Sequence, residues 1–155
     1  MLFRSFITTD AQLLRFPASA VRPQGRQAAG MAGVRLSDGA SVLAFSAIVN
    51  APAETVVVTV AGRSGALPGT GGASVKVTPF AEYPPKGRAT GGVRCQRFLK
   101  GEDGLIHAWI GPPPVIGVTE SGVVVDLTGM TGKRDSSGNA ITRQLAHLGH
   151  PFGIS

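Results

Sequence analysis

The feature that most constrains the fold of this chain is an internal repeat with a spacing of about 60 residues. A basic, glycine-rich turn at residues 83–97 has a weaker copy at residues 21–36. Repeats of this length, with about four short strands each, are typical of radial or solenoid β-architectures, in which each unit buries its faces against its neighbours. The aligned pairs are Phe16-Pro17 with Thr78-Pro79, Pro23-Gln24-Gly25-Arg26 with Pro85-Lys86-Gly87-Arg88, Gly33-Val34-Arg35 with Gly92-Val93-Arg94, and Asp38-Gly39 with Asp103-Gly104.

The composition is that of a β-rich chain with many turns. It holds 22 Gly and 11 Pro, and 43% of its residues are hydrophobic, whereas a disordered chain would need a lower hydrophobic content. No apolar stretch reaches the roughly 18 residues that a transmembrane helix needs. The single cysteine, Cys95, excludes a disulfide within the chain and indicates a reducing, cytosolic compartment. We interpret Cys95 as a small apolar packing residue, because nothing beside it marks an activated thiol.

Short β-prone runs bounded by turn residues predict an all-β fold. The run at residues 41–49 is mostly apolar, which favours burial on both of its faces. Asp10-Ala11-Gln12 and Ser37-Asp38-Gly39 are expected turns, and the glycine-rich residues 66–74 are an expected loop. The expected strands cover residues 6–9, 13–16, 33–36, 41–49, 56–61, 75–79, 93–99 and 105–110.

These runs group into two to three four-stranded blades. The proline-rich residues 111–114 are a stiff linker, and the stretch after them repeats the pattern of the first hairpin. The apolar pattern decays after Leu127, which indicates a tail. The expected division is a non-native or truncated start without structural role at 1–5, blades at 6–50 and 55–111, the start of a third blade at 115–127, and a ragged C-terminal tail at 128–155.

The charge of the chain indicates a polyanionic partner. Lysine and arginine number 15 against 9 acidic residues, so the net charge is +6 and the pI is about 10.5. Most of the basic residues are arginines, whose planar guanidinium can hold two phosphate oxygens at once. Glycine beside them lets a phosphate approach the backbone, and proline restricts the shape of the loop. The alternative interpretation is that these turns are merely solvated and that the charge only keeps the protein soluble.

No motif in the chain predicts a catalytic or metal site. His147 and His150 are three residues apart without further ligands nearby, whereas metal sites need three or four ligands. The Gly-x-Gly pattern at residues 69–72 precedes a strand, whereas a phosphate loop or dinucleotide fingerprint precedes a helix. We therefore predict no catalytic residue, no metal ligand and no cofactor bound by this chain. An intact enzyme whose site is not visible in the sequence is the weakest of the alternatives.

The repeated sequence motifs of the chain resemble those of a known family. Leu13-Leu14-Arg15-Phe16-Pro17, Arg22-Pro23-Gln24-Gly25-Arg26, and the stretch from Thr78-Pro79-Phe80 to Gly92-Val93-Arg94 are similar to the repeats of bacterial type IIA topoisomerase A subunits. The similar region is the C-terminal domain of the A subunits of DNA gyrase and of topoisomerase IV. The motifs of this chain are most similar to those of actinobacterial sequences. The resemblance covers about residues 6–127, so we expect the chain to be a fragment of such a protein.

This resemblance implies a partial β-pinwheel, a propeller-like array of four-stranded blades that exchange strands with their neighbours. It implies a basic rim that binds, bends or wraps duplex DNA without sequence preference. It also implies a cytoplasmic, nucleoid-associated protein that works with the B subunit and with the rest of the A subunit, while ATP and Mg²⁺ are used by other domains. The rim residues that it implies are Arg22, Arg26, Arg35, Lys86, Arg88, Arg94 and Arg97.

The chain departs from the family pattern in three respects. It has two to three blades instead of five or six, and it lacks the cleavage core with its tyrosine nucleophile. The gyrase box is present only as degenerate segments at residues 25–33 and 87–92. These departures leave supercoiling and decatenation open as activities of a parent ATP-dependent topoisomerase. The alternative function is a non-enzymatic β-repeat module that binds a protein or another polyanion.

Overall fold

The computed structural model describes residues 1–65 and 72–151 of the 155-residue chain, which form β-strands and two short 3-10 helices within these ranges. The elements are β1 (Leu2–Thr8), β2 (Gln12–Pro17), η1 (Ala18–Ala20), β3 (Val42–Val49), β4 (Val56–Gly62), β5 (Ala73–Pro79), η2 (Phe80–Glu82), β6 (Val93–Arg94), β7 (Gly104–Gly111), β8 (Ile116–Val118), β9 (Val124–Asp126), β10 (Asn139–Ile141) and β11 (His147–Gly149). The expected all-β fold is confirmed.

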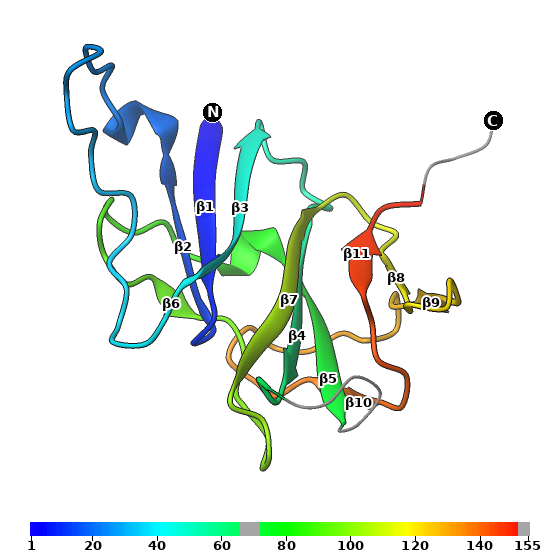
Figure 1. Cartoon of the computed structure of the whole chain (residues 1–155). Helices are drawn as coiled ribbons and strands as arrows, with labels where there is room; N and C mark the ends of the chain where they lie inside the picture. The colour runs from blue at the N-terminus through cyan, green and yellow to red at the C-terminus, as the bar shows by residue number, and fades with distance from the viewer. Residues whose placement is uncertain (66–71, 152–155) are drawn as a thin grey trace.

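The strands form three antiparallel sheets that follow one another along the chain (Figure 1). The first sheet has the order β3-β1-β2-β6, the second β10-β5-β4-β7, and the third β11-β8-β9. Each sheet starts from a hairpin, whose first strand also pairs with a later strand of the same unit. The fourth strand of the first two sheets comes from the following unit: β6 pairs with β2, and β10 pairs with β5. The sheets therefore exchange strands with their neighbours.

The central sheet shows why this sequence forms strands. Residues 56–60 read Val-Val-Val-Thr-Val, a β-branched run whose stiff side chains suit a pleated strand. Val57 packs in a core against the first sheet, while Val58 and Val60 pack in a second core against the third sheet. β4 is buried on both faces because it lies between two other sheets. One sheet of this kind therefore depends on its neighbours for stability.

Prolines end the second strand of the first two hairpins. Pro17 and Pro79 are the last residues of β2 and β5, and a 3-10 helix follows each of them. Proline lacks the N–H that the ladder needs, so it is placed where a strand stops. The alignment of Phe16-Pro17 with Thr78-Pro79 is therefore an alignment of equivalent strand ends.

The expectations for residues 33–36 and for the apolar run at residues 41–49 are wrong. Residues 33–36 form no strand, although their counterpart forms β6, because β6 has the edge of β2 to pair with and residues 33–36 have no such edge among the described residues. β3 is not buried on both faces: Phe45 and Val49 are 51% and 66% exposed. β3 lies at the outer edge of the first sheet, where only one face meets the second sheet. The glycine-rich loop expected at 66–74 lies partly outside the described residues, and its last two residues belong to β5.

Residues 2–5 and the described residues after Leu127 take part in the fold, contrary to expectation. Residues 2–5 belong to β1, and Ser5 is fully buried, because β1 is the central strand on which β2 and β3 pair. Residues 128–155 are expected to be a ragged tail, but their described part, residues 128–151, is not. They supply β10 to the second sheet and β11 to the third. The sequence did not reveal this third copy of the repeat unit, because the stretch has short loops and few apolar residues.

Candidate nucleic-acid interface

The basic loops of successive units lie side by side. The Ala89 amide donates a hydrogen bond to the Gly33 carbonyl at 2.9 Å, and the Arg35 amide donates to the Thr90 carbonyl at 3.0 Å. The guanidinium of Arg88 also donates to the Ala32 carbonyl. The two copies of the turn, more than fifty residues apart in sequence, are thereby joined through their backbones.

A third basic loop continues this arrangement. The Arg97 amide donates to the Ser136 carbonyl at 3.0 Å, and the Arg134 guanidinium donates to the Arg94 carbonyl at 2.8 Å. Lys133, the neighbour of Arg134, is exposed. The three loops therefore form a continuous series in which each is hydrogen-bonded to the next.

Sequence reasoning missed Lys133 and Arg134. A signal was present, because Gly132-Lys133-Arg134 followed by Gly138 before β10 mirrors Gly87-Arg88 followed by Gly92 before β6. The third loop lacks the prolines of the other two and follows a much shorter hairpin. These differences concealed a repeat that the strand pairing makes plain.

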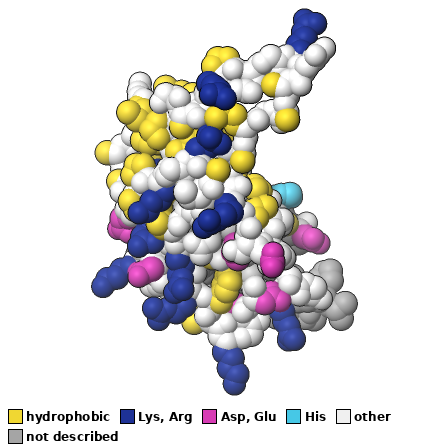
Figure 2. All heavy atoms as spheres, turned by 90° about the vertical axis from the view of Figure 1, so that its left-hand side faces the viewer, with side chains coloured by type: hydrophobic (Ala, Val, Ile, Leu, Met, Phe, Trp, Pro, Cys, Tyr) yellow, Lys and Arg dark blue, Asp and Glu magenta, His cyan; other side chains and the backbone are white. Residues whose placement is uncertain are grey.

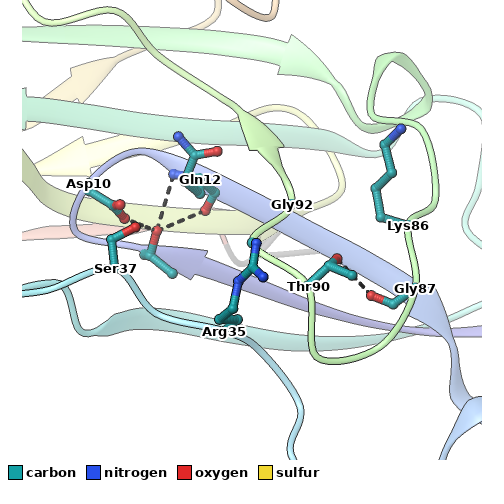
Figure 3. Close-up of a pocket in the computed structure, with 10 residues that line it drawn as sticks. Asp10, Gln12, Arg35, Ser37, Lys86, Gly87, Thr90 and Gly92 are labelled. Atoms are coloured by element: carbon teal, nitrogen blue, oxygen red, sulfur yellow. Dashed lines mark hydrogen bonds between the residues drawn. The ribbon is translucent and has the colours of Figure 1, made fainter.

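A cleft of about 430 Å³ lies where the first two loops meet the β1–β2 turn (Figure 3). Arg35 and Lys86 line it from the two loops. Its other lining residues are small or polar: Thr8, Asp10, Gln12, Ser37, Gly87, Thr90, Gly91 and Gly92. Two cations beside exposed backbone suit a phosphate group, since they supply charge and the glycines leave room for close approach.

Asp10 is the acidic residue of this cleft. Its carboxylate accepts a hydrogen bond from the Thr8 hydroxyl (Figure 3). The Thr8 hydroxyl oxygen in turn accepts from the Gln12 amide at 3.2 Å. These contacts hold Asp10 within the β1–β2 turn, whereas Arg35 and Lys86 belong to the loops that line the cleft with it.

The loop of the second unit is held against the first sheet by its backbone. The Lys86 amide donates to the Arg15 carbonyl at 3.0 Å, and the Cys95 amide donates to the Ala11 carbonyl at 2.9 Å. Gly92 lies between them with a φ of +77°, and a Cβ at this position would lie 2.4 Å from the Leu13 carbonyl oxygen. Only glycine fits here, because the backbone is left-handed and touches the neighbouring strand.

Lys76 supports the third loop from below. It is fully buried in β5, and its ammonium donates to the carbonyls of Arg134 and Ser136, both at 2.6 Å. Burial lowers the pKa of Lys76 to about 8, and the negative charge of nearby Asp135 opposes this shift. Lys76 therefore positions the loop and is not itself available to a ligand.

The single cysteine and the single tyrosine of the chain are both buried. Cys95 is inaccessible, and burial raises the pKa of its thiol to about 12, which confirms its interpretation as a packing residue. Tyr83 is equally buried, and burial raises the pKa of its hydroxyl, which lies 2.8 Å from the Thr78 hydroxyl. Both side chains belong to the core between the first and second sheets.

The residues implied as rim contacts are placed unevenly. Arg35 and Lys86 share the cleft, Arg88 bonds across the two loops, and Arg94 and Arg97 border the third loop. Arg22 and Arg26 are exposed on the loop that follows η1, which projects from the first sheet (Figure 1), and neither lines the cleft. Lysine and arginine side chains extend down the face that bears these loops, next to an apolar area in its upper part (Figure 2).

Neither a metal centre nor a membrane helix is found in the part of the chain that the structure describes. No group of three or more His, Cys, Asp and Glu side chains there is arranged to hold a metal ion. No helix among these residues is long and apolar enough to cross a membrane.

A row of strand-exchanging antiparallel sheets with a basic loop in each unit defines a propeller-type repeat domain of the β-pinwheel class. The chain belongs to the family described as the DNA gyrase C-terminal domain, beta-propeller, whose model matches residues 6–48 and 69–108. The family expected from the repeated motifs is thereby confirmed.

Curated relatives and solved structures agree with this assignment. The chain is 36% identical over 107 residues to the topoisomerase subunit TopoM of Mycolicibacterium smegmatis. The aligned region covers 68% of this chain and 14% of the relative. It is 31% identical over 128 residues to the A subunit of DNA gyrase from Staphylococcus aureus, covering 77% of this chain and 13% of the relative. The chain thus spans a small part of the length of both relatives.

Among solved structures, the fold is similar to C-terminal domains of topoisomerases. The C-terminal domain of DNA topoisomerase IV matches with a TM-score of 0.72 at 20% identity, over 96% of this chain and 46% of the other. The E. coli ParC C-terminal domain matches with a TM-score of 0.71 at 15% identity, over 96% and 61%. The DNA gyrase A C-terminal domain matches with a TM-score of 0.62 at 16% identity, over 88% and 42%.

Proposed function

We propose that this chain binds duplex DNA through its phosphates along the series of basic loops. The observation that carries the proposal is the hydrogen bonding of each loop to the next, which aligns cations from separate units. Arg35 and Lys86 share one cleft, and Lys133 extends the series. The net charge of +6 and membership of the gyrase C-terminal domain family support the same role.

The binding is expected to be independent of sequence. The cations lie on glycine-rich loops, whereas base readout uses a helix or a ribbon that enters a groove. Phosphate contacts require only charge and accessible donors. A duplex that follows loops on successive sheets would bend toward them, so we infer bending or wrapping as the consequence of the contact. Arg22 and Arg26 extend the contact on the projecting loop, and Arg88, Arg94 and Arg97 reinforce it at the loop junctions.

The role in a whole protein follows from the family. We infer that the domain presents DNA to the rest of a topoisomerase A subunit, which changes DNA topology together with a B subunit in the cytoplasm, at the nucleoid. ATP and Mg²⁺ would be used by other domains. The burial of Tyr83 supports this division, because its hydroxyl cannot reach a phosphodiester.

A second candidate function is the binding of a protein. The exposed apolar side chains of Phe45 and Val49 favour it, since large apolar residues on an edge strand commonly mark an interaction surface. This surface lies on the first sheet and is separate from the cleft residues. The two functions are therefore compatible with each other.

Gel-shift titrations of random-sequence duplex at several salt concentrations test the DNA proposal. The logarithm of the affinity is expected to fall linearly with the logarithm of salt, with a slope of roughly −0.9 for each phosphate contacted. Lys86→Ala and Lys133→Ala are each expected to weaken binding to all sequences alike and to reduce the slope by about 1. Lys86→Ala combined with Arg88→Ala should weaken it further, although Arg88 also supports the loop.

Arg63→Ala is the matched control, because it removes the same charge from the β4–β5 turn, where Arg63 lines a different groove. It should leave the slope nearly unchanged. Binding that is absent or insensitive to salt would overturn the proposal. A loss confined to one DNA sequence would instead indicate base readout.

A further inference from the structure

The second sheet buries a lysine at the place where the first sheet buries a leucine. β2 and β5 end at equivalent prolines, and the residues three positions before these prolines are Leu14 and Lys76. Leu14 is paired with Phe6 in the first sheet. Lys76 is paired with Thr59 in the second, and both of these residues are fully buried. An apolar side chain is therefore compatible with this place, whereas a buried ammonium lowers stability, so the lysine calls for a functional explanation.

The ammonium of Lys76 reaches the inner side of the third basic loop. It donates hydrogen bonds to the carbonyl oxygens of Arg134 and Ser136, both at 2.6 Å. The loop leads into β10, which pairs with β5, the strand that bears the lysine (Figure 1). The fit is close, because a Cβ added at Gly132 would lie 3.0 Å from Cδ of Lys76. The positive charge is thus held directly against the backbone of the loop that carries Lys133.

The backbone of this loop connects the buried charge to the outer side. Lys133 and Asp135 are exposed, and the residue that follows each of them is half-buried. Because a peptide group is planar and trans, the amides that follow the two bonded carbonyls, those of Asp135 and Ser137, point away from Lys76. A positive charge on the carbonyl side polarises these peptide groups and strengthens their N–H groups as donors. A phosphate on the outer side of the loop therefore interacts with Lys76 through the backbone as well as through space.

The titratable groups close to Lys76 come from three elements. Arg134 and Asp135 belong to the third loop, and Glu82 belongs to η2. Cys95, which follows β6, is also close, but its thiol is neutral because burial raises its pKa to about 12. Carboxylates and guanidinium groups keep their charges between pH 7 and pH 9.5. Burial lowers the pKa of Lys76 to about 8, so Lys76 is the group of this cluster that changes its charge in that range.

We propose that the binding of a DNA phosphate at the third loop is coupled to the protonation of Lys76, which acts as a positioning residue beneath the contact. The ammonium fixes two carbonyls of the loop and places positive charge under the phosphate, and the phosphate in turn stabilises the ammonium. Where Lys76 is partly neutral in the free protein, binding takes up a proton from the solvent. The affinity is therefore constant below the pKa of Lys76 and begins to fall as the pH rises above it. The inference rests on the proposed function and adds a dependence on pH that contacts by exposed arginines would not have.

Fluorescence anisotropy titrations of a labelled random-sequence duplex, from pH 7 to pH 9.5 at constant ionic strength, test the coupling. The affinity of the wild type is expected to fall by roughly tenfold over this range, the effect of losing one charge close to the phosphate. Lys76→Met should bind more weakly at pH 7 and should not show the fall, because its side chain cannot be protonated. Lys76→Arg keeps the charge at every pH, so it should bind like the wild type at pH 7 and retain that affinity at pH 9.5. Lys100→Met, at an exposed position of the β6–β7 connection, is the matched control and should show the fall of the wild type.

Isothermal titration calorimetry measures the proton directly. Titrations of the duplex at pH 8.5 in buffers of different ionisation enthalpy give the number of protons that the complex takes up. The wild type is expected to take up a substantial fraction of one proton more than Lys76→Met, because only the wild type has an amine at this position. An equal uptake by both proteins would contradict the coupling.

The outcomes separate this inference from the proposed function. Wild-type binding that depends on salt but not on pH would overturn the coupling and leave phosphate binding intact. The same fall with pH in the wild type and in Lys76→Met would assign the fall to another group and would also overturn the coupling. Binding that is absent or insensitive to salt would overturn the proposed function itself. Circular dichroism checks the folding of each variant, and Lys76→Met with the calorimetry decides the matter if Lys76→Arg unfolds.

Discussion

At the scale of single residues, the interface depends on buried groups that never reach its surface. Lys76 holds the third loop through two carbonyls at 2.6 Å, and Gly92 lets the second loop cross the first sheet. At neutral pH, which is below its pKa of about 8, Lys76 is charged. The folded state therefore contains a buried ammonium, which lowers its stability. The stability of the protein should therefore depend on the ionisation of this lysine.

We expect the free energy of unfolding to rise with pH just above pH 8. The pKa of Lys76 is lowered from 10.5 to about 8 in the fold, so in that window the unfolded chain binds more protons and stability increases, by at most about 1.4 kcal/mol per pH unit. Cys95 lowers the free energy of unfolding as the pH rises above about 9. Burial raises the pKa of its thiol from 9.0 to about 12, so the thiol ionises in the unfolded chain at a lower pH than in the folded protein. The net expectation is a gain of less than about 1 kcal/mol between pH 8 and 9, a plateau, and a decline above pH 10, where buried Tyr83 adds to the loss.

Urea unfolding at a series of pH values measures this profile. Lys76→Met should abolish the gain between pH 8 and 9 and leave only the decline. Lys133→Met is the matched control, because Lys133 is exposed, and its profile should follow the wild type. A wild-type profile without the gain would contradict the role given to Lys76.

At the scale of elements, the exchanged strands join one sheet to the next. β6 has only two residues, yet the segment around it bonds the first sheet on one side and the third loop on the other. The expected strand at residues 93–99 was too long, because after Arg94 the backbone leaves β2 to meet the third loop. Propensity predicts that a segment is extended, whereas the available edge decides where its pairing stops.

Gly92→Ala is expected to destabilise the protein by at least about 2 kcal/mol. The residue has a φ of +77°, and the added Cβ would lie 2.6 Å from the Leu13 carbonyl carbon, so β6 would have to move away from β2. Gly25→Ala is the control, since nothing lies within 4 Å of its added Cβ, and it should change stability by less than about 0.5 kcal/mol. Thermal or denaturant unfolding compares the two. Equal effects would show that the close approach at Gly92 is not needed.

At the scale of the whole molecule, stability comes from two cores, one on each side of the second sheet. The first core joins Ile7 and Leu13 to Val57, and the second joins Val58 and Val60 to Leu127 and other residues of the third unit. The last residues of the chain complete this second core: Leu145 is 4% exposed and packs there with Ile141 and Leu148. Residues 128–151 therefore belong to the cooperative structure.

Leu145→Ala tests this conclusion and is expected to cost about 2–4 kcal/mol of unfolding free energy, because it leaves a cavity in the second core. Thr142→Ala, at an exposed position nearby, should have little effect. Denaturant titration of both variants measures the difference. Wild-type stability of Leu145→Ala would contradict the inclusion of residues 128–151 in the cooperative structure.

Much of the site was visible in the sequence, because charge and glycine content are local properties. The repeat showed that the turns around Arg26 and Arg88 are equivalent, and the absence of activated groups around Cys95 agreed with its burial. The sequence did not show that Arg35 and Lys86 line one cleft whereas Arg22 and Arg26 do not. Distances between loops depend on the packing of separate sheets, which no local pattern records.

The class of fold, the repeat and the basic loops follow from the sequence alone. The features that produce them are β-branched runs, prolines at strand ends and clustered arginines, and each affects only the few residues around it. Which strand pairs with which sheet depends on tertiary packing. The exchange of β6 and β10, the third loop with Lys133, and the structural role of residues 2–5 all arise from pairing between distant segments. A strand is defined by the edge that accepts its hydrogen bonds, and that edge is supplied by another part of the chain.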